Sequence, residues 1–152
     1  RLEEFKDKRK SAAAERVDKR IDKMNENRTE RLAKALEQMS DILGKLEDKV
    51  ASASGAGKDT ASASAAITAA KSAVSTAQTV VSDQSAKDYA PTVTDETTLR
   101  QVFTETFTAF KTDMQAVHKQ VQDAKQLVRS AALAVRQLQV GPKPTNESQP
   151  EQ

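Results

Sequence analysis

The sequence lacks cysteine and tryptophan, and its 152 residues include one histidine, one tyrosine, four glycines and four prolines. Without cysteine the chain has no disulfide, no thiolate metal ligand and no thiol nucleophile. Aromatic residues make up 3% of the chain and apolar residues 37%, so its core must be thin and rich in small side chains. These shortages sharply narrow the enzyme classes to which the protein could belong.

Long apolar runs and an excess of one charge are also missing. The longest apolar run is Ala131 to Val135, far below the roughly 20 residues that cross a bilayer, so no transmembrane segment is expected. Lysine and arginine number 24 against 22 aspartate and glutamate residues, which leaves a net charge of +2. So small a surplus does not by itself argue for a polyanionic partner.

The clearest positive feature is a heptad pattern of apolar residues toward the C-terminal end. They recur mostly at alternating steps of four and three, with no proline or glycine between them: Phe103, Phe107, Phe110, Met114, Val117, Val121, Ala124, Val128, Ala131, Val135 and Leu138. This spacing places one continuous apolar stripe on a helix, and a stripe of that length must pack against other helices. The pattern predicts a helix over residues 95–139, with Thr94 as its cap and Gly141 and Pro142 as its stop.

A second long helix is predicted over residues 2–53. Its surface carries opposite charges four residues apart, such as Glu15 with Lys19, which is typical of a solvated helical face. An apolar stripe runs through these charges and is interrupted where Arg28 takes a seam position beside Asn25. We expect the helix to bend near Asn25.

A shorter, alanine-rich helix is predicted over residues 60–84. Gly55 and Gly57 end the preceding helix, and Asp59 or Thr60 can cap the new one. Together the three helices predict an all-α fold, an elongated antiparallel three-helix bundle or coiled coil with long first and third helices. The bundle covers residues 1–140, and residues 141–152 have the composition of a disordered tail or linker.

The unequal helix lengths predict two unpaired arms. At 1.5 Å per residue the helices span about 78, 38 and 67 Å. If the third helix begins at the level where the second ends, residues 1–28 and 120–139 project from opposite ends. An uncovered apolar stripe usually marks an interface, so the C-terminal arm of one molecule is expected to pack on the N-terminal arm of the next.

Such head-to-tail contacts give an oligomer, as a ring or an open filament, and a simple antiparallel dimer is the milder version. The leading hypothesis is therefore a non-enzymatic structural protein that assembles with itself. The expected interface has one side on the C-terminal arm and an acceptor on the N-terminal arm: Val121, Val128, Val135 and Leu138, with Val17, Ile21 and Met24.

The alternative hypothesis is a helical module that binds an anionic polymer through the N-terminal arm. Four basic residues lie close together there: Lys6, Lys8, Arg9 and Lys10. Acidic residues interleave this cluster and no aromatic platform for bases accompanies it, so a cell-wall polymer suits it better than nucleic acid.

No set of residues predicts catalysis, a metal or a cofactor. The segment Gly55 to Thr60 resembles the end of a phosphate-binding loop, but it lacks the preceding strand, the first glycine and a hydroxyl directly after Lys58. His118 has neither a second metal ligand nor a nucleophile near it in sequence. Asp18 and Asp22 lie one turn apart among lysines and arginines, and we interpret them as solvated surface.

The order of these parts resembles a family of uncharacterised exported helical proteins from bacteria of the candidate phyla radiation. The likeness lies in the charged opening helix of residues 1–50, the small-residue segment SAAITAAKSAVSTAQTVV and the closing segment FKTDMQAVHKQVQDAKQLVRSAALAVRQL. The resemblance implies a removed signal peptide, which would explain a chain that starts at Arg1, and a location at the cell envelope or outside the cell. It implies no active site.

Overall fold

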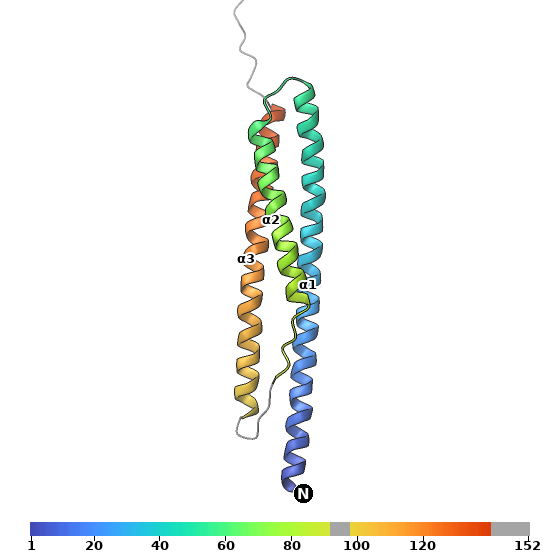
Figure 1. The fold of residues 1–152 in the computed structure, drawn as a ribbon, viewed down its shortest axis with the longest axis vertical. Coiled ribbons are helices and arrows are strands. Elements are labelled where there is room, and N and C mark those ends of the chain that lie inside the picture. Colours follow the sequence, from blue (N-terminus) through green and yellow to red (C-terminus); the bar gives the residue numbers. More distant parts are fainter. Residues whose placement is uncertain (92–97, 141–152) are drawn as a thin grey trace, which may run out of the picture.

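The computed structural model describes residues 1–91 and 98–140, with three helices among them: α1 (Leu2–Gly55), α2 (Ala61–Ser85) and α3 (Leu99–Val140). They lie side by side and alternate in direction (Figure 1). The predicted all-α bundle with long first and third helices is confirmed, and the ends of the first two helices lie within two residues of the predicted ones. The predicted first turn of the third helix, 95–97, and the predicted tail, 141–152, lie outside the described residues.

The turn between α1 and α2 is a Schellman cap. The N–H of Gly57 donates to the carbonyl of Ser54 (3.0 Å) and that of Lys58 to the carbonyl of Ala53 (3.0 Å), which satisfies carbonyls at the helix end. Gly57 adopts a left-handed φ of 81°, which glycine reaches without a steric cost. Asp59 then accepts a hydrogen bond from the N–H of Ala61 (3.1 Å) at the start of α2. The cap explains why glycine is needed here, without any phosphate-binding role.

The core follows the predicted stripes of all three helices. Its largest fully buried side chains include Phe110, Ile21, Leu36, Leu43 and Met114, and alanines such as Ala70, Ala77 and Ala124 allow close helix packing. α1 is one helix across Asn25, and no break in it separates two helices. The polar interruption of the stripe is therefore taken up inside one helix.

The prediction of a free C-terminal arm is wrong, because the chain after α2 does not turn back at once. It continues in the direction of α2 along α1 before α3 begins (Figure 1). Tyr89, just past α2, packs edge-on against Phe110 with ring centroids 5.4 Å apart, and Phe110 lies about 16 Å along α3 from Leu99. α3 thus starts much nearer the N-terminal end of α1 than expected. Its other end reaches the α1–α2 turn, where Lys58 Nζ donates to the carbonyl of Leu138 (2.7 Å).

Candidate functional site

The residues expected to form an exposed C-terminal seam are part of the core instead. Val121, Val128 and Val135 expose only 5%, 6% and 2% of their surface, and Leu138 is partly buried against the same cluster. On the acceptor side, Ile21 is completely buried. The other two acceptor residues, Val17 and Met24, are partly buried and packed on the core. These seven residues therefore hold the bundle together, and the expected arm-to-arm contact through them is not available to the folded chain.

The N-terminal end of α1 does project beyond the core. We call residues 2–16 the N-terminal extension, because the first buried residue of α1 is Ile21. Leu2 and Phe5 expose 76% and 60% of their surface on it. The guanidinium of Arg9 lies 5.0 Å from the centre of the Phe5 ring, a cation–π contact. The predicted basic cluster is on this extension, with three members exposed and the last half-buried: Lys6, Lys8, Arg9 and Lys10.

A buried polar layer closes the bundle where α2 ends. Asn25 Nδ2 donates to the main-chain carbonyl of Gln84 (2.8 Å). The side-chain Nε2 of Gln84 donates to Asn25 Oδ1 (3.0 Å) and to the Tyr89 hydroxyl (2.8 Å). The Tyr89 hydroxyl donates in turn to Asp113, which also pairs with Lys87 (3.1 Å). Asn25 and Gln84 are almost completely buried. The layer links α1, α2, the following loop and α3, and it is hydrogen-bonded throughout, which is the condition for burying such groups at low cost.

The same layer shifts the acidity of its members. Burial and the hydrogen bond to Asp113 raise the pKa of Tyr89 to about 12. The Tyr89 hydroxyl and the Lys87 ammonium lower the pKa of Asp113, against the effect of its partial burial. Both shifts reflect a neutral tyrosine that donates a hydrogen bond to an ionised aspartate.

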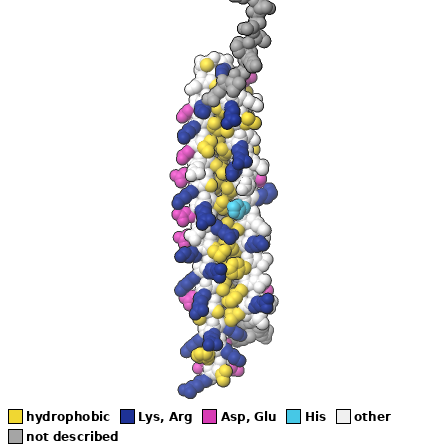
Figure 2. All heavy atoms as spheres, turned by 180° about the vertical axis from the view of Figure 1, so that it is seen from behind, with side chains coloured by type: hydrophobic (Ala, Val, Ile, Leu, Met, Phe, Trp, Pro, Cys, Tyr) yellow, Lys and Arg dark blue, Asp and Glu magenta, His cyan; other side chains and the backbone are white. Residues whose placement is uncertain are grey.

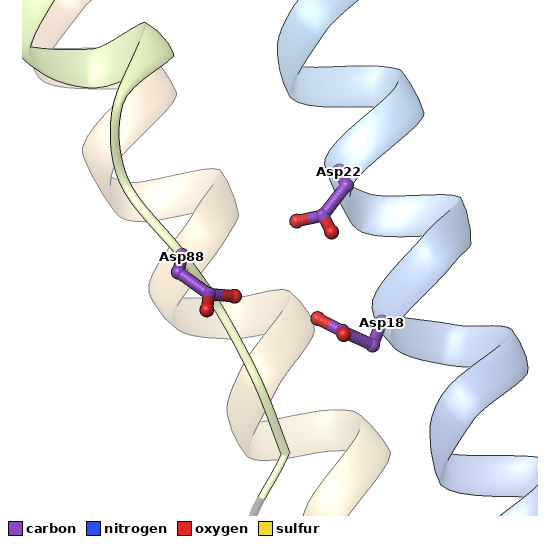
Figure 3. A group of neighbouring side chains, drawn as sticks. All are labelled: Asp18, Asp22 and Asp88. Carbon is purple, nitrogen blue, oxygen red and sulfur yellow. The ribbon is translucent and has the colours of Figure 1, made fainter.

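Three carboxylates meet beside this layer. Asp18 and Asp22 of α1 face Asp88 of the loop after α2 (Figure 3), with oxygen atoms within 4.8 Å of one another. Burial, followed by the charges of Asp18 and Asp88, raises the pKa of Asp22. One oxygen of Asp18 is buried and has no hydrogen-bond partner among the described residues. Asp22 and Asp88 are exposed to water, so the cluster concentrates negative charge, and the described residues around it form no enclosed, hydrogen-bonded ligand shell.

Part of these arrangements can be predicted from the sequence. The spacing of Asp18 and Asp22 places them one turn apart on α1, whereas Asp88 joins them only through the fold. His118 is exposed on α3. Gly55 to Thr60 is a capped turn between two helices. None of the described helices is long and apolar enough to cross a membrane.

Comparison with known proteins identifies no relative. No protein-family model matches the chain, and neither a curated protein nor a solved structure gives a significant match. The structure shows an all-α fold, in which three helices with long first and third members pack as a bundle.

Proposed function

We propose that the protein is a non-enzymatic helical structural protein that pairs with a second copy of itself through the N-terminal extension. The observation that carries this proposal is the exposure of Leu2 and Phe5 on a helix that extends beyond its own bundle. Isolated helical segments of this length are marginal in water and gain stability mainly by packing an apolar face. Among the described residues, none packs over Leu2 and Phe5 of the extension closely enough to bury them.

The sequence of the extension suits antiparallel pairing. Leu2, Phe5, Arg9 and Ala12 follow one another at steps of three and four, so they lie on one face. If Asp7 of two copies is placed at the centre of the pair, Leu2 of one copy lies opposite Ala12 of the other and Phe5 opposite Arg9. A large side chain then meets a small one, and the cation–π contact of Phe5 with Arg9 is repeated between the copies.

The charges flanking this seam both favour and oppose the arrangement. Glu4 of one copy lies opposite Lys10 of the other, and a two-fold axis makes this pair occur twice, whereas Lys6 lies opposite Lys8 and these like charges repel. The seam is short, so the dimer should be weak and dependent on concentration. Since its stability comes mainly from apolar packing, it should tolerate salt.

Sedimentation equilibrium over a range of protein and salt concentrations tests this proposal. Phe5→Asp should abolish the dimer, because it places a charge in the apolar seam. Leu133→Asp is the matched control: Leu133 is also exposed, at 54% of its surface, but lies on α3 away from the extension, and this variant should dimerise like the parent. A parent chain that stays monomeric at every concentration, or a Phe5→Asp variant with an unchanged mass, would contradict the proposal.

A second candidate function is binding of an anionic cell-surface polymer by the same extension. It is favoured by four basic side chains that form no ion pair with another described residue: Lys6, Lys8, Arg9 and Lys10. Polymer binding should weaken steeply with salt, unlike the apolar seam, and should be lost when these residues are replaced by glutamine. The resemblance to exported bacterial proteins supports a location at the cell envelope or outside the cell for either function.

A further inference from the structure

The side of the bundle opposite α2 carries an apolar stripe between two rows of basic side chains. Figure 2 shows this side: hydrophobic side chains form a nearly continuous band along the molecule, lysines and arginines flank it, and acidic side chains gather mainly at the margins. We call it the α1/α3 face. It is made by one flank of each long helix: Arg28, Ala35, Ile42 and Lys49 of α1, and Lys111, His118, Lys125 and Ala132 of α3.

The contacts of α1 establish which of its flanks this is. Glu47 pairs with Lys71 of α2, and Ser40 accepts a hydrogen bond from Gln78 of α2 (3.5 Å), so the flank of Ser40 and Glu47 faces α2. Arg28, Ala35, Ile42 and Lys49 recur every seven residues on the other side of the buried stripe. The guanidinium of Arg28 lies 5.6 Å from the centre of the Phe110 ring, which shows that this flank adjoins α3.

On α3, Asp113 contacts Tyr89 and Lys87 in the loop after α2, so the flank of Asp113 faces that loop. The side of the buried stripe opposite Asp113 is occupied, at seven-residue steps, by Lys111, His118 and Lys125. Figure 2 agrees, because the single histidine of the chain is seen on this face beside the apolar band.

The basic side chains of the face are not neutralised within the described residues. None of them is in an ion pair with another described residue, whereas paired lysines lie on other flanks, as Lys34 with Glu30 and Lys119 with Asp123 show. The face includes or adjoins seven exposed cations: Arg28, Arg31, Lys45 and Lys49 of α1, and Lys111, Lys125 and Arg129 of α3. Glutamates of α1 instead line the grooves between α1 and α2: Glu26, Glu30 and Glu47. The bundle is thus electrostatically two-sided.

The half-exposed apolar residue at the middle of this face is Ile42, with 43% of its surface accessible. Two antiparallel helices with an apolar band between them offer the site of a further bundle helix, which would pack its own apolar ridge against the band. From Arg28 to Lys49 the band extends about 32 Å, the length of a helix of about 21 residues.

We propose that the α1/α3 face binds an acidic amphipathic helix of a partner protein, lengthwise, as a fourth helix. The apolar band matches the apolar stripe of such a helix, and glutamates or aspartates flanking that stripe would meet the basic rows. A second copy of this chain does not fit through the same face, because cations would then oppose cations. A purely ionic polymer would leave the apolar band without a partner. This inference does not depend on the N-terminal extension.

The test measures binding of a synthetic peptide to the full chain by isothermal titration calorimetry. The peptide is a helix of about 21 residues with leucine at the a and d heptad positions and glutamate at the flanking positions. Two comparison ligands carry equal charge without an apolar stripe: a peptide of the same composition in scrambled order, and polyglutamate. The proposal expects binding of the patterned peptide that is at least about tenfold tighter than of either comparison ligand.

Variants locate the site. The double variant Lys49→Glu with Lys125→Glu should weaken binding of the patterned peptide by about tenfold or more, and so should Ile42→Asp alone. The matched control, Lys34→Glu with Lys119→Glu, changes net charge equally on other flanks and should bind within about twofold of the parent. Circular dichroism establishes that each variant is folded. Equal binding of the scrambled peptide or polyglutamate, or equal weakening in the control, would overturn the proposal in favour of nonspecific attraction to acidic polymers.

Discussion

The buried polar layer supports a sharp prediction about stability. Asn25 and Gln84 lie in core positions of α1 and α2 and hydrogen-bond to each other. Replacing one of them should therefore leave the other without a partner. We consider Asn25→Leu, Gln84→Leu and the double variant. Leucine has the branched outline of asparagine and favours helix, so the changes remove the polar contacts while keeping a side chain of comparable length in the core.

The magnitudes follow from the bonds that each change removes. Asn25→Leu deletes two hydrogen bonds worth about 1 kcal/mol each and leaves a buried Gln84 amide hydrogen unpaired, so the loss should be about 2–4 kcal/mol. The double variant leaves no such group unpaired. The main-chain carbonyl of residue 84 still accepts a hydrogen bond from the N–H of Lys87, and the Tyr89 hydroxyl still donates to Asp113. Two leucines would also bury new apolar surface. The double variant should therefore unfold within about 1 kcal/mol of the parent.

Urea denaturation followed by circular dichroism at constant protein concentration measures the four free energies of unfolding. The expected coupling between the two positions is about 1–3 kcal/mol. Losses that simply add, with the double variant the least stable of the four, would refute the idea that the two amides satisfy each other. The slope of the denaturation curve should stay unchanged, since the surface exposed on unfolding is nearly the same.

Three other changes test separate features. Asp22→Asn should stabilise the chain at pH 7, and the gain should shrink as pH falls through the raised pKa of Asp22, because protonation then relieves the same repulsion in the parent. Tyr89→Phe should cost about 1–2 kcal/mol at pH 7; part of this loss should vanish in acid, as pH falls through the lowered pKa of Asp113, when that carboxylate is neutral in both chains. Gly44→Ala should stabilise by about 1 kcal/mol, because Gly44 lies inside α1 with open space around it, whereas Gly57→Ala should destabilise by a similar amount at its left-handed φ. Thermal and urea unfolding measure the change in stability for each variant. If the two glycine changes both stabilised or both destabilised the chain, the reasoning about their backbone conformations would be contradicted.

The helices themselves could be predicted from the sequence because their determinants are local. Apolar steps of three and four, and glycines at the α1–α2 turn, mark α1 and α2 to within two residues. The level at which α3 begins could not be predicted in this way, since a heptad stripe on α3 packs equally well after a slip along the bundle. That level depends on contacts of the loop after α2, above all of Tyr89 with Phe110 and Asp113. The prediction of a free C-terminal arm was wrong because it placed the start of α3 at the level where α2 ends.

The polar layer was visible in the sequence only in part. The apolar stripe is interrupted at Asn25, but the predicted seam position of Arg28 is wrong, because Asn25 and Thr29 are the buried residues there. A better signal lay in α2, where Gln84 follows Ala77 and Val81 at the same alternating spacing and so continues the core with a polar residue. Two polar residues at core positions of different helices could have suggested that they meet. Which partner each would find depends on helix register.

The unequal helix lengths also imply that resistance to opening varies along the molecule. Above the polar layer α1 packs with both α2 and α3, whereas below it α2 has ended and the residues of α1 before Ile21 are not buried. Local opening costs least where few apolar contacts must break. Amide hydrogens of α1 should therefore exchange with solvent in a graded order, first in the N-terminal extension, then up to Asn25, and only with global unfolding from Leu32 to Val50. The Asn25 and Gln84 pair would then mark the boundary at which fraying from the N-terminal end stops.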